Sequence, residues 1–260
     1  MTTPGALTLR DLVSGPARFR AVTAWGPAGA IVALVAMALV IAVLQIGSLG
    51  VAARLIGEDE YNRQIATGTL AAPIMLLSTL MTQIPLIAML WIAADRAGLR
   101  AETLQLAQRP LGWGASLVAG GALVAALALL QVGLHAAVPG YDLTQEARSF
   151  AAGLNSPLWW GTVLAIGVLA PVSEELLARG FLLTALSNSR LGVAGGGLIS
   201  NVLWTSLHFQ YSWGSLLTVF CGGLALTWLV WRTGSLRAAI VAHMVVNATV
   251  LGYLAAFSEA

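Results

Sequence analysis

Two neighbouring glutamates and an arginine lie inside an otherwise apolar segment of the chain. Glu174, Glu175 and Arg179 fall within residues 158–186, a run long enough to cross a bilayer. Ionisable side chains at that depth carry a large desolvation cost, so they are rare in membrane spans and mark functional sites by default. These three residues are therefore the first candidates for chemistry.

The spacing gives the two glutamates different roles. Glu175 and Arg179 stand at i and i+4 on one helical face, with the carboxylate N-terminal to the cation, which is the favourable order for an ion pair. Glu174 is turned about 100° away and has no such partner within its own helix. We predict that Glu175 and Arg179 form a structural pair that orients the site, with a direct chemical role as the alternative. Glu174 remains available for proton transfer.

Polar residues also recur in two later apolar runs. In residues 195–208, Asn201, Trp204 and His208 recur at i, i+3 and i+7, which is one face of a helix. In residues 236–257, His243 and Asn247 stand at i and i+4, again on one face. Each of these two faces therefore presents a histidine together with an amide side chain.

Depth in the membrane allows these faces to share a layer with Glu174, with a mismatch of several Å if the helices are straight. At about 1.5 Å per residue, Glu174, His208 and His243 lie roughly 12–20 Å from the ends of their helices. A single intramembrane histidine is often only a hydrogen-bond partner between helices. Two histidines, a carboxylate and an amide from three spans are more typical of a constructed polar site. His135, which has no polar companion, is interpreted as an interfacial or packing residue.

Composition places the chain among membrane proteins. Hydrophobic residues make up 58% of it, charged residues 9%, and the mean hydropathy is +0.84. A soluble domain has about 25% charged residues, so no sizeable soluble domain is expected. The net charge of +2 is too small to indicate a nucleic-acid partner. The single cysteine, Cys221, is interpreted as a packing residue.

The apolar runs predict an all-α fold, a polytopic bundle of transmembrane helices with a polar site inside the membrane. Seven spans are expected, and an eighth follows if residues 140–152 are also embedded. The expected spans are residues 26–49, 70–94, 112–138, 158–186, 195–208, 214–231 and 236–257. We divide the chain into an amino-terminal arm (1–25), helices without a recognisable motif (26–150) and helices that carry the polar site (151–260).

Arginine placement predicts the orientation. All 13 basic residues are arginine. In the seven-span topology, nine of them lie on the same side of the membrane as the amino-terminal arm, and three lie on the opposite side. Arg179 is the remaining one, inside the membrane. Because positive charge is enriched on the cytoplasmic side, the amino terminus is expected in the cytoplasm and the carboxyl terminus outside. The expected location is the cytoplasmic (inner) membrane.

The ordered motifs resemble those of a known family. Glu174-Glu175-x3-Arg179, then Trp204-x3-His208, then His243-x3-Asn247 are similar to the motifs of the CPBP family of intramembrane proteases, also called the ABI family. This family includes the type II CAAX prenyl endopeptidases, and the resemblance covers residues 158–257. Trp204 stands where the family usually has phenylalanine, which keeps an aromatic ring at the site and affects substrate shape more than chemistry.

The resemblance implies hydrolysis of peptide bonds within the membrane. Glu174 and His208 would activate water, while His243 and Asn247 would stabilise the oxyanion. This agrees with the residue types, because amide hydrolysis needs a base for water and donors for the developing negative charge. The orienting residues would be Glu175, Arg179, Asn201 and Trp204.

A metal-dependent version uses the same side chains. Glu174, His208 and His243 are the ligand types of some catalytic zinc sites, although the chain has no His-Glu-x-x-His pattern. The metal-independent arrangement is favoured, so no cofactor is expected, with zinc as the alternative.

Two other classes of protein could use these residues. A transporter could relay protons through buried glutamate and histidine, but matching halves with broken helices are not evident in the sequence. A non-catalytic relative could bind or chaperone a partner, for instance in bacteriocin self-protection. The expected partners of an active enzyme are the lipid bilayer and a membrane-tethered protein or peptide, and prenylation of that substrate is not implied.

Overall fold

Long apolar helices make up most of the chain. The computed structural model describes residues 5–67, 72–142 and 148–257, and within these residues helices and their connections account for the fold. The first half contains α1 (Leu9–Ser14), α2 (Pro27–Ile56), α3 (Glu58–Thr67), α4 (Ala72–Ala94), the 3-10 turn η1 (Arg96–Gly98), α5 (Arg100–Thr103) and α6 (Trp113–Ala137). The second half contains α7 (Arg148–Leu154), α8 (Trp159–Leu164), η2 (Ala165–Leu169), α9 (Ala170–Glu175), η3 (Leu176–Leu182), α10 (Leu183–Ser187), α11 (Gly192–Ser206), α12 (Trp213–Thr233) and α13 (Leu236–Phe257).

The fold confirms a polytopic helical bundle. Six helices of the described part are long and apolar enough to cross a membrane: Pro27–Ile56, Pro73–Ala94, Trp113–Ala137, Trp159–Ser187, Trp213–Thr233 and Leu236–Ala256. They match six of the seven expected spans. The remaining one, α11, has 15 residues and is about 22 Å long, less than the roughly 30 Å of a hydrocarbon core. The proposed eighth span falls partly outside the described residues.

The helix expected at 195–208 differs from α11 at both ends. α11 begins at Gly192 and stops at Ser206, so His208 lies in the turn that follows it and not on the helix itself. The Leu207 N–H donates to Trp204 and Thr205 carbonyls, which tightens and ends the helix at this point. The sequence correctly placed Asn201 and Trp204 on the helix, but the helical position of His208 was wrong.

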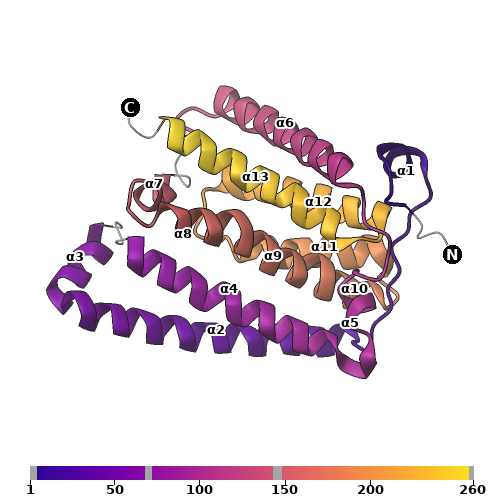
Figure 1. The fold of residues 1–260 in the computed structure, drawn as a ribbon, viewed down its shortest axis with the longest axis horizontal. Helices are drawn as coiled ribbons and strands as arrows, with labels where there is room; N and C mark the ends of the chain where they lie inside the picture. The colour runs from indigo at the N-terminus through magenta and orange to yellow at the C-terminus, as the bar shows by residue number, and fades with distance from the viewer. Residues whose placement is uncertain (1–4, 68–71, 143–147, 258–260) are drawn as a thin grey trace.

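The helices lie side by side along the long axis of the molecule (Figure 1). The continuous helical segment from α8 to α10 runs through the middle, with α4 and α2 on one side and α13 and α6 on the other, while α11 and α12 lie behind. The most apolar part of this central segment is 61% buried, against 6% for the corresponding part of α6. The glutamates are therefore carried by the most enclosed of the long helices.

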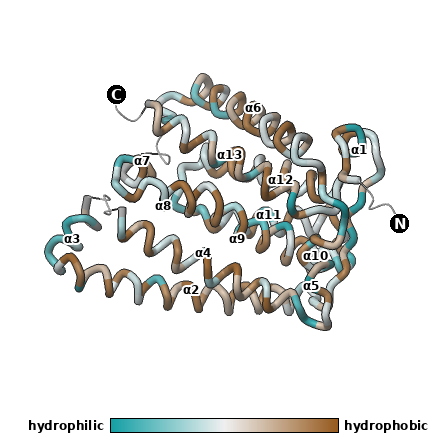
Figure 2. The backbone as a smooth tube through the Cα atoms, in the orientation of Figure 1, coloured by the Kyte–Doolittle hydropathy of each residue, from teal (hydrophilic) through white to brown (hydrophobic). Residues whose placement is uncertain are grey.

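One end of the bundle gathers the arginine-rich segments. The amino-terminal arm, the 95–112 connection and the turn after α12 are joined by backbone hydrogen bonds, including Phe19 N–H to the Trp231 carbonyl and Leu236 N–H to the Gln105 carbonyl. The short helix α1 and the carboxyl-terminal end of α13 lie at opposite ends of the bundle (Figure 1). Hydrophilic residues concentrate toward these ends, while the long helices are mostly hydrophobic between them (Figure 2).

Glycine makes the tight turn at the arginine-rich end possible. Gly234 ends α12 in the left-handed conformation, with φ of 63°, and its N–H donates to the Val230 carbonyl. A Cβ atom there would stand 2.8 Å from the Arg18 carbonyl oxygen. This turn places α13 antiparallel to α12, which brings His243 back to the middle of the bundle.

Candidate active site

The helix that carries the two glutamates is irregular. Its α-helical turn α9 lies between two π-helical stretches, η2 and η3, in which the turns are wider. π-turns of this kind often occur at functional sites. Glu174 and Glu175 therefore stand on a short regular turn between two widened ones, a feature that the sequence did not predict.

Glu175 and Arg179 form a fully enclosed ion pair. Arg179 Nη1 donates to Glu175 Oε1 at 2.9 Å, and the two side chains are 1% and 0% exposed. Arg179 Nη2 donates to Asn201 Oδ1 at 3.1 Å, and Asn201 Nδ2 donates to the Phe220 carbonyl at 3.0 Å. This chain of bonds ties the central helix to α11 and α12 and pairs the two buried charges, while Glu175 Oε2 and Arg179 Nε are buried without a hydrogen-bond partner among the residues that the structure describes.

Gly223 of α12 leaves room for this network. A Cβ atom at that position would overlap Asn201 Oδ1 and would stand 2.6 Å from Arg179 Nη2 and 2.7 Å from the Trp204 ring. Glycine at this point lets α12 approach closely, as small residues do between membrane helices.

The same Glu175 oxygen also contacts His243. His243 Nδ1 lies 2.9 Å from Glu175 Oε1, which already accepts from Arg179. Because this oxygen acts as an acceptor, the imidazole proton is on Nδ1, and Nε2 of the neutral ring has a lone pair. Glu175 thus fixes the tautomer and the orientation of His243 as well as pairing with Arg179.

Trp204 lies at the centre of the site. Its indole N–H donates to Glu174 Oε2 at 2.9 Å, and its ring faces the Arg179 guanidinium at 4.2 Å. The rings of His208 and His243 meet it edge to face, with centroids 5.1 and 5.9 Å away. Phenylalanine could stack in the same way but has no N–H. The indole therefore binds the carboxylate directly, a contact that the sequence analysis did not predict. The effect of the tryptophan on substrate shape and on chemistry stays a prediction.

Glu174 and His208 face each other across the cavity. His208 Nε2 lies 4.0 Å from Glu174 Oε2, and the side chains are 18% and 21% exposed. His208 Nδ1 is 3.2 Å from the Trp204 carbonyl, which can only accept, so the proton again belongs on Nδ1. One water molecule about 2.8 Å from both facing atoms fits this separation. The pair is thus suited to holding and deprotonating water.

Asn247 is the second polar residue that α13 contributes to the site. It lies one turn after His243, and its Nδ2 donates to the Ile166 carbonyl of η2 at 2.8 Å. The side chain also lines the cavity that contains Glu174 and His208. The structure therefore brings all eight sequence-predicted site residues into one connected group.

The cavity between these residues has a volume of about 750 Å³. Its walls include residues of α2, α4, α6, α12 and α13 besides the site itself. The sequence analysis missed several polar members of this wall, among them Gln45, Ser78, Thr82, Gln83 and Tyr211.

Gln83 is the missed residue with the most direct link to the site. Its Oε1 accepts a hydrogen bond from Ser173, the residue before Glu174, and Ser173 is completely buried. An amide side chain in the middle of an apolar run was the signal that could have identified it.

The three side chains of the alternative zinc site are not gathered into one group. Within the residues that the structure describes, no three His, Cys, Asp or Glu side chains are grouped closely enough to hold one metal ion. Glu174 and His208 converge, whereas His243 contacts Glu175 through Nδ1, which leaves Nε2 as its ligand atom. As placed, Glu174, His208 and His243 do not form a ligand set.

Part of the chain is similar to known proteins. Residues 156–249 match the family described as type II CAAX prenyl endopeptidase Rce1-like. An uncharacterized 24.3 kDa protein of Escherichia coli is 34% identical over 140 residues, which is 51% of this chain and 62% of that protein.

Two proteins of Lactococcus lactis subsp. lactis (strain IL1403) are also similar. The UPF0177 protein YajF is 33% identical over 64 residues, or 25% of this chain and 30% of its own. The UPF0177 protein YxdF is 29% identical over 82 residues, or 32% and 44%. The matches span less than two thirds of each relative's length. No solved structure matches the chain. Residues 156–249 of this multi-pass membrane protein, which carry Glu174, His208, His243 and Asn247, are similar to the Rce1-like type II CAAX prenyl endopeptidases, as the motifs indicated.

Proposed function

We propose that this protein is an intramembrane endopeptidase that hydrolyses peptide bonds of membrane-associated proteins or peptides. The observation that carries the proposal is the convergence of Glu174 and His208, 4.0 Å apart, on a cavity that is also lined by His243 and Asn247. The match of residues 156–249 to the Rce1-like family supports a peptidase of the CAAX type.

The proposed reaction begins with water between Glu174 and His208. Glu174 accepts one proton while the His208 Nε2 lone pair holds the other hydrogen, and the hydroxide oxygen adds to the substrate carbonyl carbon. The tetrahedral intermediate then loses its C–N bond, and the leaving nitrogen takes the proton from Glu174. The products are a carboxylic acid and an amine, and Glu174 returns to the carboxylate.

Asn247 and His243 are proposed to stabilise the oxyanion of the intermediate. An Asn247 N–H not used by Ile166 is one donor. Neutral His243 cannot donate from Nε2, because its proton is on Nδ1 toward Glu175. We therefore assign the oxyanion contact of His243 to the imidazolium form, whose charge Glu175 stabilises. The orienting role is assigned to Glu175, Arg179, Asn201 and Trp204.

Cleavage of a membrane-tethered peptide by purified protein in detergent tests this function. An active wild-type protein with an inactive Glu174→Ala variant supports the endopeptidase, whereas a folded wild-type protein that cleaves no such peptide favours a binding protein or transporter. Comparing membrane peptides from cells with active protein and with the Glu174→Gln variant would then identify substrates.

The location follows from the same reasoning. We propose the cytoplasmic (inner) membrane, with the amino terminus and the arginine-rich end of the bundle in the cytoplasm. The proposed partners are the lipid bilayer and a membrane-tethered protein or peptide.

The Trp204→Phe variant should lower kcat by about tenfold, because a hydrogen bond to a charged group contributes about 1.5 kcal/mol. Phenylalanine keeps the ring over Arg179, so the folded fraction should remain that of the wild type. The comparison is with Trp204→Ala, which removes the ring as well and should lose both activity and thermal stability. Equal kcat for Trp204→Phe and wild type would show that the indole hydrogen bond contributes nothing to catalysis.

Removal of metal should leave the activity intact. We expect cleavage to survive exhaustive chelation, and elemental analysis to find much less than one zinc per chain, because Glu174, His208 and His243 do not converge as ligands. Stoichiometric, tightly bound zinc, with activity restored only by metal after stripping, would instead place these three residues around the ion.

A further inference from the structure

Pro171 interrupts the hydrogen bonding of the helix just before the two glutamates. At the end of η2 the Ala170 N–H donates to the Ala165 carbonyl, which is the π-helical pairing across five residues. In that pairing the next donor, to the Ile166 carbonyl, would be residue 171. This residue is proline and has no N–H. The regular α-helical donor to Ile166 would be Ala170, whose N–H is already used.

The Ile166 carbonyl obtains its donor from another helix. Asn247 Nδ2 of α13 donates to it at 2.8 Å. A carbonyl oxygen can only accept, so the amide group of Asn247 is fixed with its NH2 toward η2. An unpaired backbone carbonyl would be costly in the apolar interior of a membrane protein, which makes this bond hard to replace.

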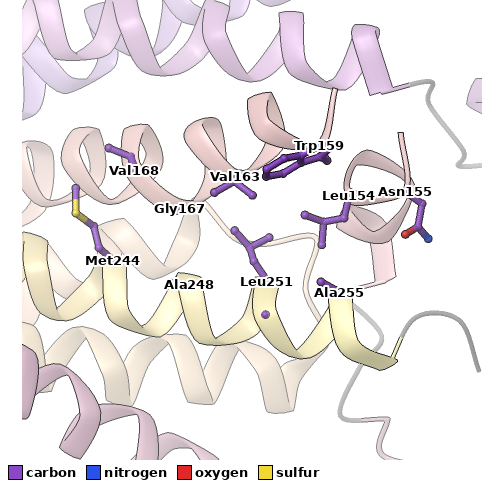
Figure 3. Close-up of a pocket in the computed structure, with 11 residues that line it drawn as sticks. Leu154, Asn155, Trp159, Val163, Gly167, Val168, Met244, Ala248, Leu251 and Ala255 are labelled. Atoms are coloured by element: carbon purple, nitrogen blue, oxygen red, sulfur yellow. The ribbon is translucent and has the colours of Figure 1, made fainter. Parts of the chain in front are cut away.

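The hydrogen bond between Asn247 and Ile166 lies between two different cavities. On one side lies the polar cavity, which Ile166, Asn247 and Glu174 line. On the other lies a groove of about 560 Å³ between α8–η2 and α13, with largely apolar walls. Figure 3 shows this groove, with Val163, Gly167 and Val168 on one wall and Met244, Ala248 and Leu251 on the other. Asn247 faces away from the groove, toward the polar side.

We infer that Pro171 is a positioning residue for Asn247: by leaving the Ile166 carbonyl without a helical donor, it fixes the amide that faces the reacting carbonyl. The inference rests on the proposed function. One N–H of Asn247 is held by Ile166, and the rigid plane of the amide then fixes the direction of the second N–H. His243, one turn earlier on the same helix, is fixed independently by Glu175.

A purely structural role of the Asn247–Ile166 hydrogen bond predicts a different result from a positioning role. If Asn247 only satisfies the Ile166 carbonyl, then supplying that carbonyl with a backbone donor should stabilise the protein and leave catalysis unchanged. If the bond positions a catalytic amide, the same change should free Asn247 and lower kcat in a folded protein.

The test is the Pro171→Ala variant, in which residue 171 gains an N–H and the helix can pair the Ile166 carbonyl itself. We expect kcat for a membrane-tethered peptide to fall about tenfold, with KM within about twofold of the wild type, because an oxyanion donor acts mainly in the transition state. The melting temperature in detergent should stay equal or rise. Pro85→Ala is the matched control, because Pro85 also lies inside a long helix, α4, and contributes to none of the site contacts described above.

A double-variant cycle with Asn247→Ala separates the two halves of the inference. In the Pro171 background, Asn247→Ala should lower the melting temperature by about 5 °C, and in the Pro171→Ala background by much less. The double variant should be no less active than Asn247→Ala alone. Additive losses of kcat, or an unchanged kcat for Pro171→Ala, would overturn the positioning role.

The stability half of the cycle does not depend on catalysis. If the wild-type protein cleaves no peptide, the proposed function fails and the catalytic part of the inference fails with it. The hydrogen bond from Asn247 to Ile166 is still established if the effect of Asn247→Ala on the melting temperature is much smaller in the Pro171→Ala protein. If the wild-type protein is active and the two substitutions change the melting temperature additively, the proposed function stands and the link between Pro171 and Asn247 is wrong.

Discussion

Glu174→Gln should lower the rate of peptide cleavage by about two to four orders of magnitude while leaving the protein folded. Glutamine keeps the size of the side chain, and its Oε1 can still accept the hydrogen bond that Trp204 Nε1 donates at 2.9 Å. It cannot accept a proton from water. The measurement is single-turnover cleavage of a membrane-tethered peptide, together with thermal unfolding in detergent.

The neighbouring residue provides the control for this prediction. Glu175→Gln changes the same functional group one position along, but there it affects a carboxylate that is completely buried between Arg179 and His243. Its main effect should therefore be on stability and on the orientation of His243. If Glu174→Gln unfolds the protein while Glu175→Gln leaves it folded and inactive, the base and the structural partner have been assigned the wrong way round.

Arg179→Ala should destabilise the protein by about 3–5 kcal/mol, because it leaves the Glu175 carboxylate buried without its cation. Asn201 Oδ1 also loses its donor, and the Trp204 ring loses the guanidinium that lies 4.2 Å from its centre. Chemical or thermal unfolding in detergent, monitored by tryptophan fluorescence and by circular dichroism, measures the effect.

The double change Glu175→Gln with Arg179→Met should recover much of this stability, since neither buried charge remains. Activity should return only in part, because Glu175 Oε1 also holds His243 Nδ1 at 2.9 Å and a neutral amide stabilises an imidazolium less well. Recovery of full activity would mean that the charge on Glu175 has no part in catalysis.

An exposed ion pair of the same protein gives a matched reference. Arg63 and Glu60 of α3 are paired, but their side chains are 71% and 35% exposed. Arg63→Ala should therefore leave the free energy of unfolding almost unchanged. A similar loss of stability for Arg63→Ala and Arg179→Ala would show that burial of the Glu175–Arg179 pair is not what makes it important.

The sequence by itself determined the features that depend on local geometry. Long apolar runs predict membrane helices because backbone polar groups in lipid must be paired within the segment. The i and i+4 spacing of Glu175 and Arg179 predicts their contact because a helix brings such residues together whatever surrounds them. The site residues could be listed for the same reason, since ionisable and amide side chains are unusual in apolar helices.

Tertiary structure alone decided which atoms meet. The bond from Trp204 to Glu174, and the oxygen of Glu175 shared by Arg179 and His243, join helices whose crossing angles no local pattern encodes. The early end of α11, which leaves His208 in a turn, also lay beyond what the apolar run indicated. The π-helical stretch before Pro171 leaves the Ile166 carbonyl for Asn247, 81 residues away in the chain. The types of residue at the site follow from the chain, but their pairing follows from how the helices pack, because these contacts are made between segments and not within them.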